Sequence, residues 1–211
     1  MSPGCWLALC TASRYRADLE VYGPVLSEGL RFKWSSVKET PLLAAFHSDN
    51  RTLALGCIAV ENGAMASVVY VFRVNQSEDR AQLCAISNPN AIPVQTVFLS
   101  GNRLLVLCDT GYAAVYDLTG QELFRYPYGD RRLVAAEVGD TYIAMVFGSS
   151  AQENSVLVTV DHDLQPMGQL SVEGTPSSLA ATAKGVSLLV GQEVLAFTPA
   201  AALQVELLAE V

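Results

Sequence analysis

The residues best suited to chemistry in this 211-residue chain are its five cysteines. A thiolate can act as a nucleophile or as a metal ligand. Cys10, Cys57 and Cys108 occupy the same place in three successive repeats, four residues after an aligned apolar start. Neighbouring sheets pack about 10 Å apart, and a disulfide needs Cα atoms within about 7 Å. We therefore expect these three to be small core side chains. Cys5 and Cys84 do not have zinc-site spacing.

The two histidines stand beside acids in short polar segments. His47 is followed by Asp49, and His162 lies between Asp161 and Asp163. Adjacent residues seldom point at one ion, and no distant ligand is evident in the sequence. The pattern is typical of solvated turns, so we predict no metal site and no cofactor.

A catalytic constellation does not follow from the remaining polar residues. A nucleophile triad needs Ser or Cys, His and an acid in mutual reach, and no elbow motif nominates a serine. Glycoside hydrolysis needs two carboxylates. The acids available for this chemistry fall in predicted turns or at exposed strand positions: Glu20, Glu61, Asp117, Asp130 and Asp140. We assign none of them a catalytic role and predict that the chain is not an enzyme.

Three aromatic residues are candidates for ligand contact. Trp34, Tyr126 and Tyr128 lie at or just after predicted outer strands, where rings could stack on sugars or peptides. Packing between neighbouring sheets would explain the same positions.

The elements that position these residues come from an internal repeat about 45 residues long. An apolar strand, a small turn and an alternating strand can be superposed five times, and Val, Tyr and Phe are typical of half-buried strands. The apolar strands are 6–10, 53–57, 104–108, 142–146 and 186–190. The strands that follow them are 18–22, 67–72, 112–116, 155–160 and 193–197. A third strand follows in turn, for instance at 30–34, 122–126 and 204–208.

Four repeats also begin with a leading strand of small apolar residues. These leading strands are 42–46, 94–98, 133–137 and 178–182. With turns at 48–50, 100–102, 109–111, 119–120 and 184–185, each repeat becomes a four-stranded antiparallel blade. We predict an all-β, β-propeller-like array of about five blades, with approximate bounds 1–36, 37–88, 89–128, 129–173 and 174–211.

The first repeat has no leading strand, because the chain opens in its second strand. An open array exposes an apolar sheet at each end. The pattern fits a missing upstream part, a compact five-bladed ring, or closure by a second chain. We favour the missing part, which makes the array incomplete at its N-terminus.

The amino-acid composition and the charge distribution disfavour some classes of partner. Hydrophobic residues make up 51% and charged residues 16% of the chain, so disorder is disfavoured. Residues 1–132 carry 12 basic and 12 acidic residues, whereas residues 133–211 carry Lys184 and 9 acids. This excess disfavours nucleic acid. No apolar run reaches the ~18 residues of a membrane helix, so we expect no membrane insertion by this chain itself.

The third repeat, residues 101–124, resembles a blade of quinoprotein-like and WD40-like propellers. It departs from both, because Phe124 replaces a tryptophan and no Trp-Asp dipeptide occurs. As a whole the chain is more similar to a bacterial family, common in gut Firmicutes, whose members have a membrane anchor before an extracytoplasmic propeller-like domain. Residues 4–34, 48–55 and 126–130 carry this resemblance. It implies a location at the cell surface and carries over no functional residue.

These features favour a non-catalytic binding or scaffold module for a protein, peptide or glycan, because propellers present rigid faces and loops. An enzyme acting on glycans is the alternative, with acids converging on a central channel. A third hypothesis places the function in missing N-terminal blades. Self-association through open blade faces would follow from an unclosed array.

Overall fold

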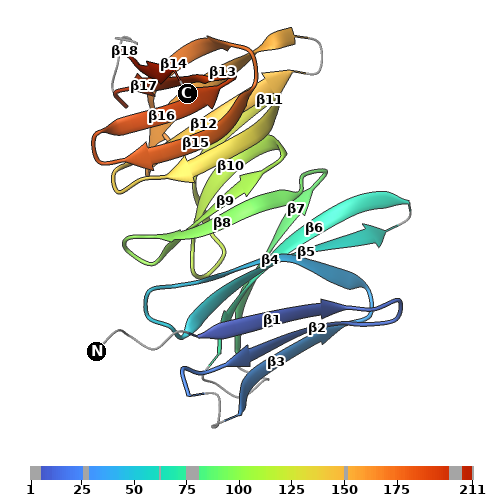
Figure 1. Ribbon diagram of the computed structural model, residues 1–211. Helices are drawn as coiled ribbons and strands as arrows, with labels where there is room; N and C mark the ends of the chain where they lie inside the picture. Colours follow the sequence, from blue (N-terminus) through green and yellow to red (C-terminus); the bar gives the residue numbers. More distant parts are fainter. Residues whose placement is uncertain are drawn as a thin grey trace. The chain divides into compact units, whose positions relative to one another are not determined.

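The structure is a computed structural model that describes residues 6–25, 29–61, 63–74, 81–149, 152–199 and 206–210. Cys5 lies outside these residues. Within them the eighteen elements are all β-strands (Figure 1). The chain divides into two compact units, residues 1–108 with 116–122, and residues 109–115 with 123–211.

The first unit contains a three-stranded sheet, a four-stranded sheet and a hairpin, all antiparallel. The three-stranded sheet has the order β1 (Leu7–Ala12), β2 (Ala17–Tyr22) and β3 (Leu30–Ser36). The four-stranded sheet has the order β4 (Glu39–Phe46), β5 (Thr52–Glu61), β6 (Ala64–Arg73) and β7 (Gln82–Pro89). The hairpin is formed by β8 (Pro93–Leu99) and β9 (Arg103–Cys108). The three-stranded first sheet and the four strands of the second agree with the sequence pattern.

The second unit repeats the same meander. The first group of strands is β11 (Glu122–Val138), β12 (Tyr142–Ser149), β13 (Gln152–Asp161) and β14 (Pro166–Glu173). The second sheet has the order β15 (Pro176–Thr182), β16 (Gly185–Val190), β17 (Glu193–Phe197) and β18 (Glu206–Glu210). Strand β10 (Thr110–Asp117) is divided between the two units.

Strand β11 differs from the expectation. The sequence predicts two strands, 122–126 and 133–137, joined by a link, whereas β11 runs through both as 17 residues. Gly129 has a φ of 64°, a left-handed conformation that glycine adopts without steric cost. The strand therefore passes the predicted link without a loop, and β12 pairs with its second half from Arg132 onward.

The core of the first unit follows from alternation along its strands. In β2, Leu19 and Val21 are fully buried, and the residues between them face outward. They join Phe32 of β3 and Phe72 of β6, whose ring centroids lie 5.0 Å apart. Two sheets thus share one apolar cluster, which fixes the face that each presents to solvent.

The core of the second unit also joins two sheets. The buried Tyr142 of β12 donates a hydrogen bond from its hydroxyl to the Thr182 carbonyl, 2.8 Å away, and accepts one from the Thr182 amide at 3.1 Å. Val146 and Leu188 belong to the same buried cluster. The tyrosine therefore supplies both backbone groups of Thr182 with partners while its ring fills the core.

Two cysteines at the same place in the repeat lie in different environments, and the effect of replacing each one can be compared. Cys57 is fully buried and Cys10 is exposed, although both follow the same apolar pattern. Cys57→Ser places a hydroxyl in an apolar core, so we expect the free energy of unfolding to fall by about 2 kcal/mol. Cys10→Ser is the matched control, with an expected change within about 0.5 kcal/mol. Urea denaturation measures both, and equal losses would contradict the packing role.

Candidate functional site around the connection from β3 to β4

The polar face of the first sheet arises from the same alternation that builds its core. Asp18 and Glu20 of β2 lie between buried residues and therefore face away from the core. In the antiparallel register Asp18 is opposite Ser35 and Glu20 is opposite Lys33. Directly opposite side chains on one face lie close enough to interact, so the register alone pairs each acid with a donor.

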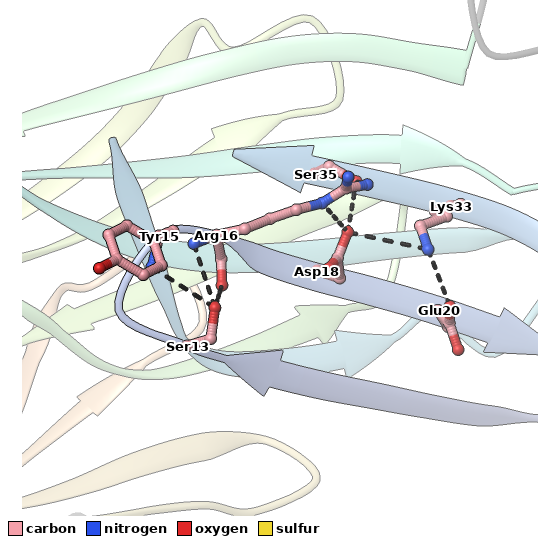
Figure 2. A network of polar contacts seen from close by, with 7 residues as sticks. All are labelled: Ser13, Tyr15, Arg16, Asp18, Glu20, Lys33 and Ser35. Atoms are coloured by element: carbon pink, nitrogen blue, oxygen red, sulfur yellow. Dashed lines mark hydrogen bonds and ion pairs between the residues drawn. The ribbon is translucent and has the colours of Figure 1, made fainter. Parts of the chain in front are cut away.

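Figure 2 shows how these side chains meet. Lys33 Nζ lies 2.9 Å from Glu20 Oε1 and 3.8 Å from Asp18 Oδ1. Asp18 Oδ1 also accepts hydrogen bonds from Ser35 Oγ at 2.5 Å and from Arg16 Nε at 2.8 Å. Arg16 in turn donates through Nη2 to Ser35 Oγ at 2.8 Å. The network holds β2, β3 and the turn before β2 together.

The two acids of this network lie close together but lack the asymmetry of a glycosidase pair. The Ser35 hydroxyl, ahead of Arg16 and Lys33, lowers the pKa of Asp18. The hydrogen bond from Lys33 lowers the pKa of Glu20 and raises that of Lys33 itself. A glycosidase needs one carboxyl group with a raised pKa to act as the acid. Both carboxylates here are stabilised in the charged form.

The chain leaves this network through an exposed turn. Ser36 Oγ accepts hydrogen bonds from the amides of Lys38 at 3.2 Å and Glu39 at 3.1 Å. Val37, between Ser36 and Lys38, is 78% exposed. A cavity of about 420 Å³ is lined by Arg16 and residues 35–38. It offers two basic side chains, two hydroxyl groups and one apolar side chain.

A second cavity of about 400 Å³ begins at the next residue, Glu39. The Tyr70 hydroxyl donates a hydrogen bond to Glu39 Oε1 at 2.6 Å, joining β6 to β4. Burial, followed by this hydrogen bond, raises the pKa of Tyr70. Small side chains on β5, β6 and β7 complete the lining. We call residues 35–39, with Arg16 and Tyr70, the connection surface.

The three predicted aromatic residues lie in different environments. Trp34 is half-buried, and its ring centroid lies 5.9 Å from that of Tyr70, so it adjoins the second cavity. Tyr126 and Tyr128 belong to the second unit, and their ring centroids lie 6.4 Å apart. Tyr128 is only 4% exposed and meets Phe147 edge-on at 4.7 Å. The contacts of Tyr128 are those of sheet packing, and Trp34 likewise packs against the apolar core of the first unit, next to Tyr70 of the second cavity.

The histidines occupy the turns expected from the sequence. His47 Nδ1 accepts a hydrogen bond from the Asp49 amide at 3.1 Å, and its ring meets Phe98 edge-on. His162 Nε2 lies 3.0 Å from the Gly139 carbonyl oxygen. Over the part of the chain that the structure describes, no three side chains of His, Cys, Asp and Glu gather in a way that could hold a metal ion.

The cysteines differ from one another in burial. Cys57 and Cys108 are buried, Cys84 is half-buried and Cys10 is exposed; these four, which are the cysteines within the described residues, are free thiols. Burial raises the pKa of Cys57 to about 12. A thiol with such a pKa carries little thiolate at neutral pH and is a poor nucleophile.

Comparison with known proteins finds similarity in structure only. No family model and no curated protein sequence matches the chain. The crystal structure of BamB from Moraxella catarrhalis is similar to this chain, with a TM-score of 0.58 and 10% sequence identity. The similarity covers 97% of this chain and 61% of the BamB chain. The similarity to the C-terminal WD40 domain of Sif2 covers 87% of this chain and 52% of the Sif2 chain, with 10% sequence identity and a TM-score of 0.56. The similarity to a structure from an analysis of two prolyl endopeptidases covers 96% of this chain and 33% of that protein, with 16% sequence identity and a TM-score of 0.59.

These likenesses show the fold. The chain has a β-propeller-type fold, WD40-like and BamB-like, and it spans less than two thirds of each of these three proteins. The resemblance to the membrane-anchored bacterial family stays a prediction. Within the described residues, no helix is long and apolar enough to cross a membrane.

Sequence reasoning missed the connection surface. Glu39 and Tyr70 are 31 residues apart, and no local rule joins residues on different strands before the register is known. One signal was present, because Val37 interrupts a polar segment between two predicted strands.

The network makes a directional prediction for two pKa values. In Lys33→Gln, we expect the pKa of Glu20 to rise toward its ordinary value, because its main hydrogen-bond donor is lost. Asp18 retains Ser35 and Arg16, so its pKa is expected to rise less. NMR titration of the side-chain carboxyl groups measures both. Lys38→Gln is the control, and a Glu20 pKa that stays low in Lys33→Gln would refute the assignment.

The turn at Asp49 makes a prediction about pH. Partial burial raises its pKa, but hydrogen bonds from the Arg51 and Thr52 amides and the Thr52 hydroxyl outweigh this and lower it to about 2. A lowered folded-state pKa stabilises the fold above the unfolded pKa, and this contribution is lost as pH falls from 3.8 to about 2.

We expect Asp49→Asn to cost about 1 kcal/mol at pH 7, because solvent screens this partly exposed group. The cost is expected to fall toward zero below pH 2, where Asp49 becomes protonated in the folded state as well. Urea denaturation across this pH range measures the difference. Asp140→Asn changes another exposed turn and serves as the control. If Asp49→Asn lowers the free energy of unfolding by the same amount at every pH, the ionised Asp49 carboxylate does not stabilise the turn.

Proposed function

We propose that this chain is a non-catalytic module that binds a protein partner through the connection surface. The observation that carries the proposal is the position of Val37, which is 78% exposed and lines one cavity, two residues before Glu39, which lines a second cavity of different chemistry. Large exposed apolar patches rimmed by polar residues mark interaction sites, whereas a single exposed apolar residue does not; here the two cavities beside Val37 supply the rest of the surface. The β-propeller-type fold supplies the rigid support that such a surface needs.

The two cavities define the partner chemistry. Lys38 lines one cavity together with Arg16, Ser35 and Ser36. Because Arg16 and the Ser35 hydroxyl already bind Asp18, Lys38 is the cation that we propose for a partner's carboxylate. The hydrogen-bonded pair of Glu39 and Tyr70 lines the other. A loop or segment with one apolar side chain on Val37 and an acid toward the basic cavity fits this arrangement. It is a protein surface, not a glycan, that combines these groups.

The charged groups support binding rather than catalysis. Asp18 and Glu20 are engaged with Arg16, Lys33 and Ser35, and the pKa of each acid is lowered. General acid–base catalysis favours groups whose pKa lies near the working pH. The network therefore holds a fixed pattern of charge beside the connection surface.

The three aromatic residues predicted to contact a ligand have different proposed roles. Trp34 adjoins the second cavity through Tyr70 and is proposed to support the partner from below the surface. Tyr126, half-buried in the second unit, is proposed as a separate contact, with Tyr128 packed behind it.

Two matched valines test the proposal. Val37 and Val60 are both exposed valines of the first unit, at 78% and 72%. Proteins captured by the immobilised chain from its source cells are identified by mass spectrometry, and an enriched protein is then purified and titrated by calorimetry. We expect Val37→Asp to weaken binding by at least about tenfold, as for a central interface residue, and Val60→Asp to leave it unchanged.

Two results would count against this function. One is a purified partner that binds Val37→Asp as tightly as the unchanged chain. The other is the absence of any protein enriched above an immobilised unrelated control. Circular dichroism of each variant shows whether a loss of binding comes instead from unfolding.

A further inference from the structure

Lys38 and Glu39 are neighbours in the chain and carry opposite charges, yet they line different cavities. Lys38 belongs to the cavity of about 420 Å³, and Glu39 belongs to the second cavity, of about 400 Å³. No residue within the described parts of the chain forms an ion pair with either side chain. The connection surface therefore presents a positive and a negative group, each directed to its own cavity and without an ionic partner there.

The hydroxyl of Tyr70 positions the carboxylate of Glu39 without neutralising it. Among the described residues it is the hydrogen-bond partner of this side chain, donating to Oε1 at 2.6 Å. A carboxylate has about four acceptor positions on its two oxygens, so further donors can bind. The Tyr70 ring lies 5.9 Å from that of Trp34 and 5.7 Å from that of Phe72, centroid to centroid. The carboxylate is thus held by a ring that is itself packed on both strands.

Apart from Glu39, the described residues that line the second cavity are neutral, and most of them are small. Ser67 is 5% exposed, and its hydroxyl is engaged with the Ala91 carbonyl at 2.6 Å. Ser87 is exposed, and its hydroxyl has no hydrogen-bond partner among the described residues, so it offers a second acceptor. The small side chains leave a volume within the range of about 300–1,000 Å³ that is typical of ligand pockets. The cavity thus combines one fixed negative charge with space beside it.

We propose that the second cavity binds a cationic group, and that in the complex of the proposed function this group is a lysine or arginine side chain of the protein partner. Charge-assisted hydrogen bonds to Glu39 would hold it. A partner that reaches both cavities then carries an acid for Lys38 and a base for Glu39, beside its contact with Val37. The opposite order would bring like charges together, so the pair also fixes the direction in which the partner binds. The source of the cation rests on the proposed function, whereas the cation site does not.

The probe is n-butylguanidinium chloride, which has the charged group and roughly the length of an arginine side chain. It is titrated into the intact chain at constant ionic strength, and the side-chain carboxyl carbons are followed by NMR. We expect a saturable shift at Glu39 with a Kd on the order of tens of millimolar, as befits one small group. Glu20, already paired with Lys33, is the control within the same spectrum and is expected to stay unchanged. The neutral analogue n-butylurea is expected to shift neither.

An added internal cation tests the site without removing Glu39. Ala59 of β5 stands directly opposite Glu39 of β4 in the antiparallel register, and side chains at such positions interact. Ala59→Lys therefore brings an ammonium group to the carboxylate, and we expect it to weaken binding of the probe by at least about fivefold. Ala59→Gln, which adds a neutral side chain of similar length, is the matched control and is expected to retain binding. Glu39→Gln is expected to abolish it, and circular dichroism verifies that each variant is folded.

The same variants are then titrated with the partner identified for the proposed function. We expect Glu39→Gln and Ala59→Lys each to weaken its binding by at least about fivefold, and Ala59→Gln to leave it within about twofold. A partner that is weakened by Val37→Asp but binds Glu39→Gln and Ala59→Lys as tightly as the unchanged chain would overturn this inference and leave the proposed function standing. Saturable binding of the probe at Glu39 without any captured partner would support the cation site while the proposed function fails.

Three results of the probe titration would overturn the inference. The first is no saturable shift at Glu39, which would mean that the cavity is closed to a cation or that its charge is already paired. The second is an equal shift at Glu39 and Glu20, which would mean general screening by the added salt. The third is equal binding of the probe to Ala59→Lys and Ala59→Gln. None of these measurements involves a protein partner, so binding at Val37 is judged separately.

Discussion

Each strand of this chain has to find backbone partners on its edges while its side chains alternate between two faces. Strand β2 shows how much depends on this. Leu19 and Val21 enter the core, and Asp18 and Glu20 enter the polar network. A slip of one residue would exchange the two faces. The register that buries the leucine therefore also brings Glu20 opposite Lys33, and the core and the surface network are set by the same pairing.

The same constraint acts between sheets. A sheet of three or four strands has two faces, and each apolar face needs a neighbour. Phe32 and Phe72 meet across two sheets of the first unit, and Tyr142 joins two sheets of the second through both backbone groups of Thr182. In each unit the apolar faces of two sheets are therefore buried against each other.

The sequence allowed prediction of those features that depend on neighbouring residues. Period-two alternation located the strands, and Asn50 and Asn102 have positive φ in turns that were expected from their residue types. The course of β11 through residues 127–132 was not predicted, because Tyr-Pro-Tyr-Gly-Asp is typical of a link. The Glu39–Tyr70 pair was missed because its partners meet only after β4 and β6 are placed on either side of β5. The prediction that the repeated cysteines are core side chains is confirmed for Cys57 and Cys108 and wrong for Cys10, which is exposed, because equal places in a repeat do not ensure equal packing.

The titratable groups that the fold perturbs move away from neutral pH in both directions. Hydrogen bonds lower the pKa of Asp49 to about 2, and burial raises that of Cys57 to about 12. Asp18 and Glu20 move downward and Tyr70 upward. Groups shifted in these directions keep one charge state across the physiological range, so they contribute a constant electrostatic pattern rather than a proton donor or acceptor. The charges of Asp18, Glu20 and Asp49 are therefore constant over this range, and such charges determine which opposite charges on another molecule would complement them.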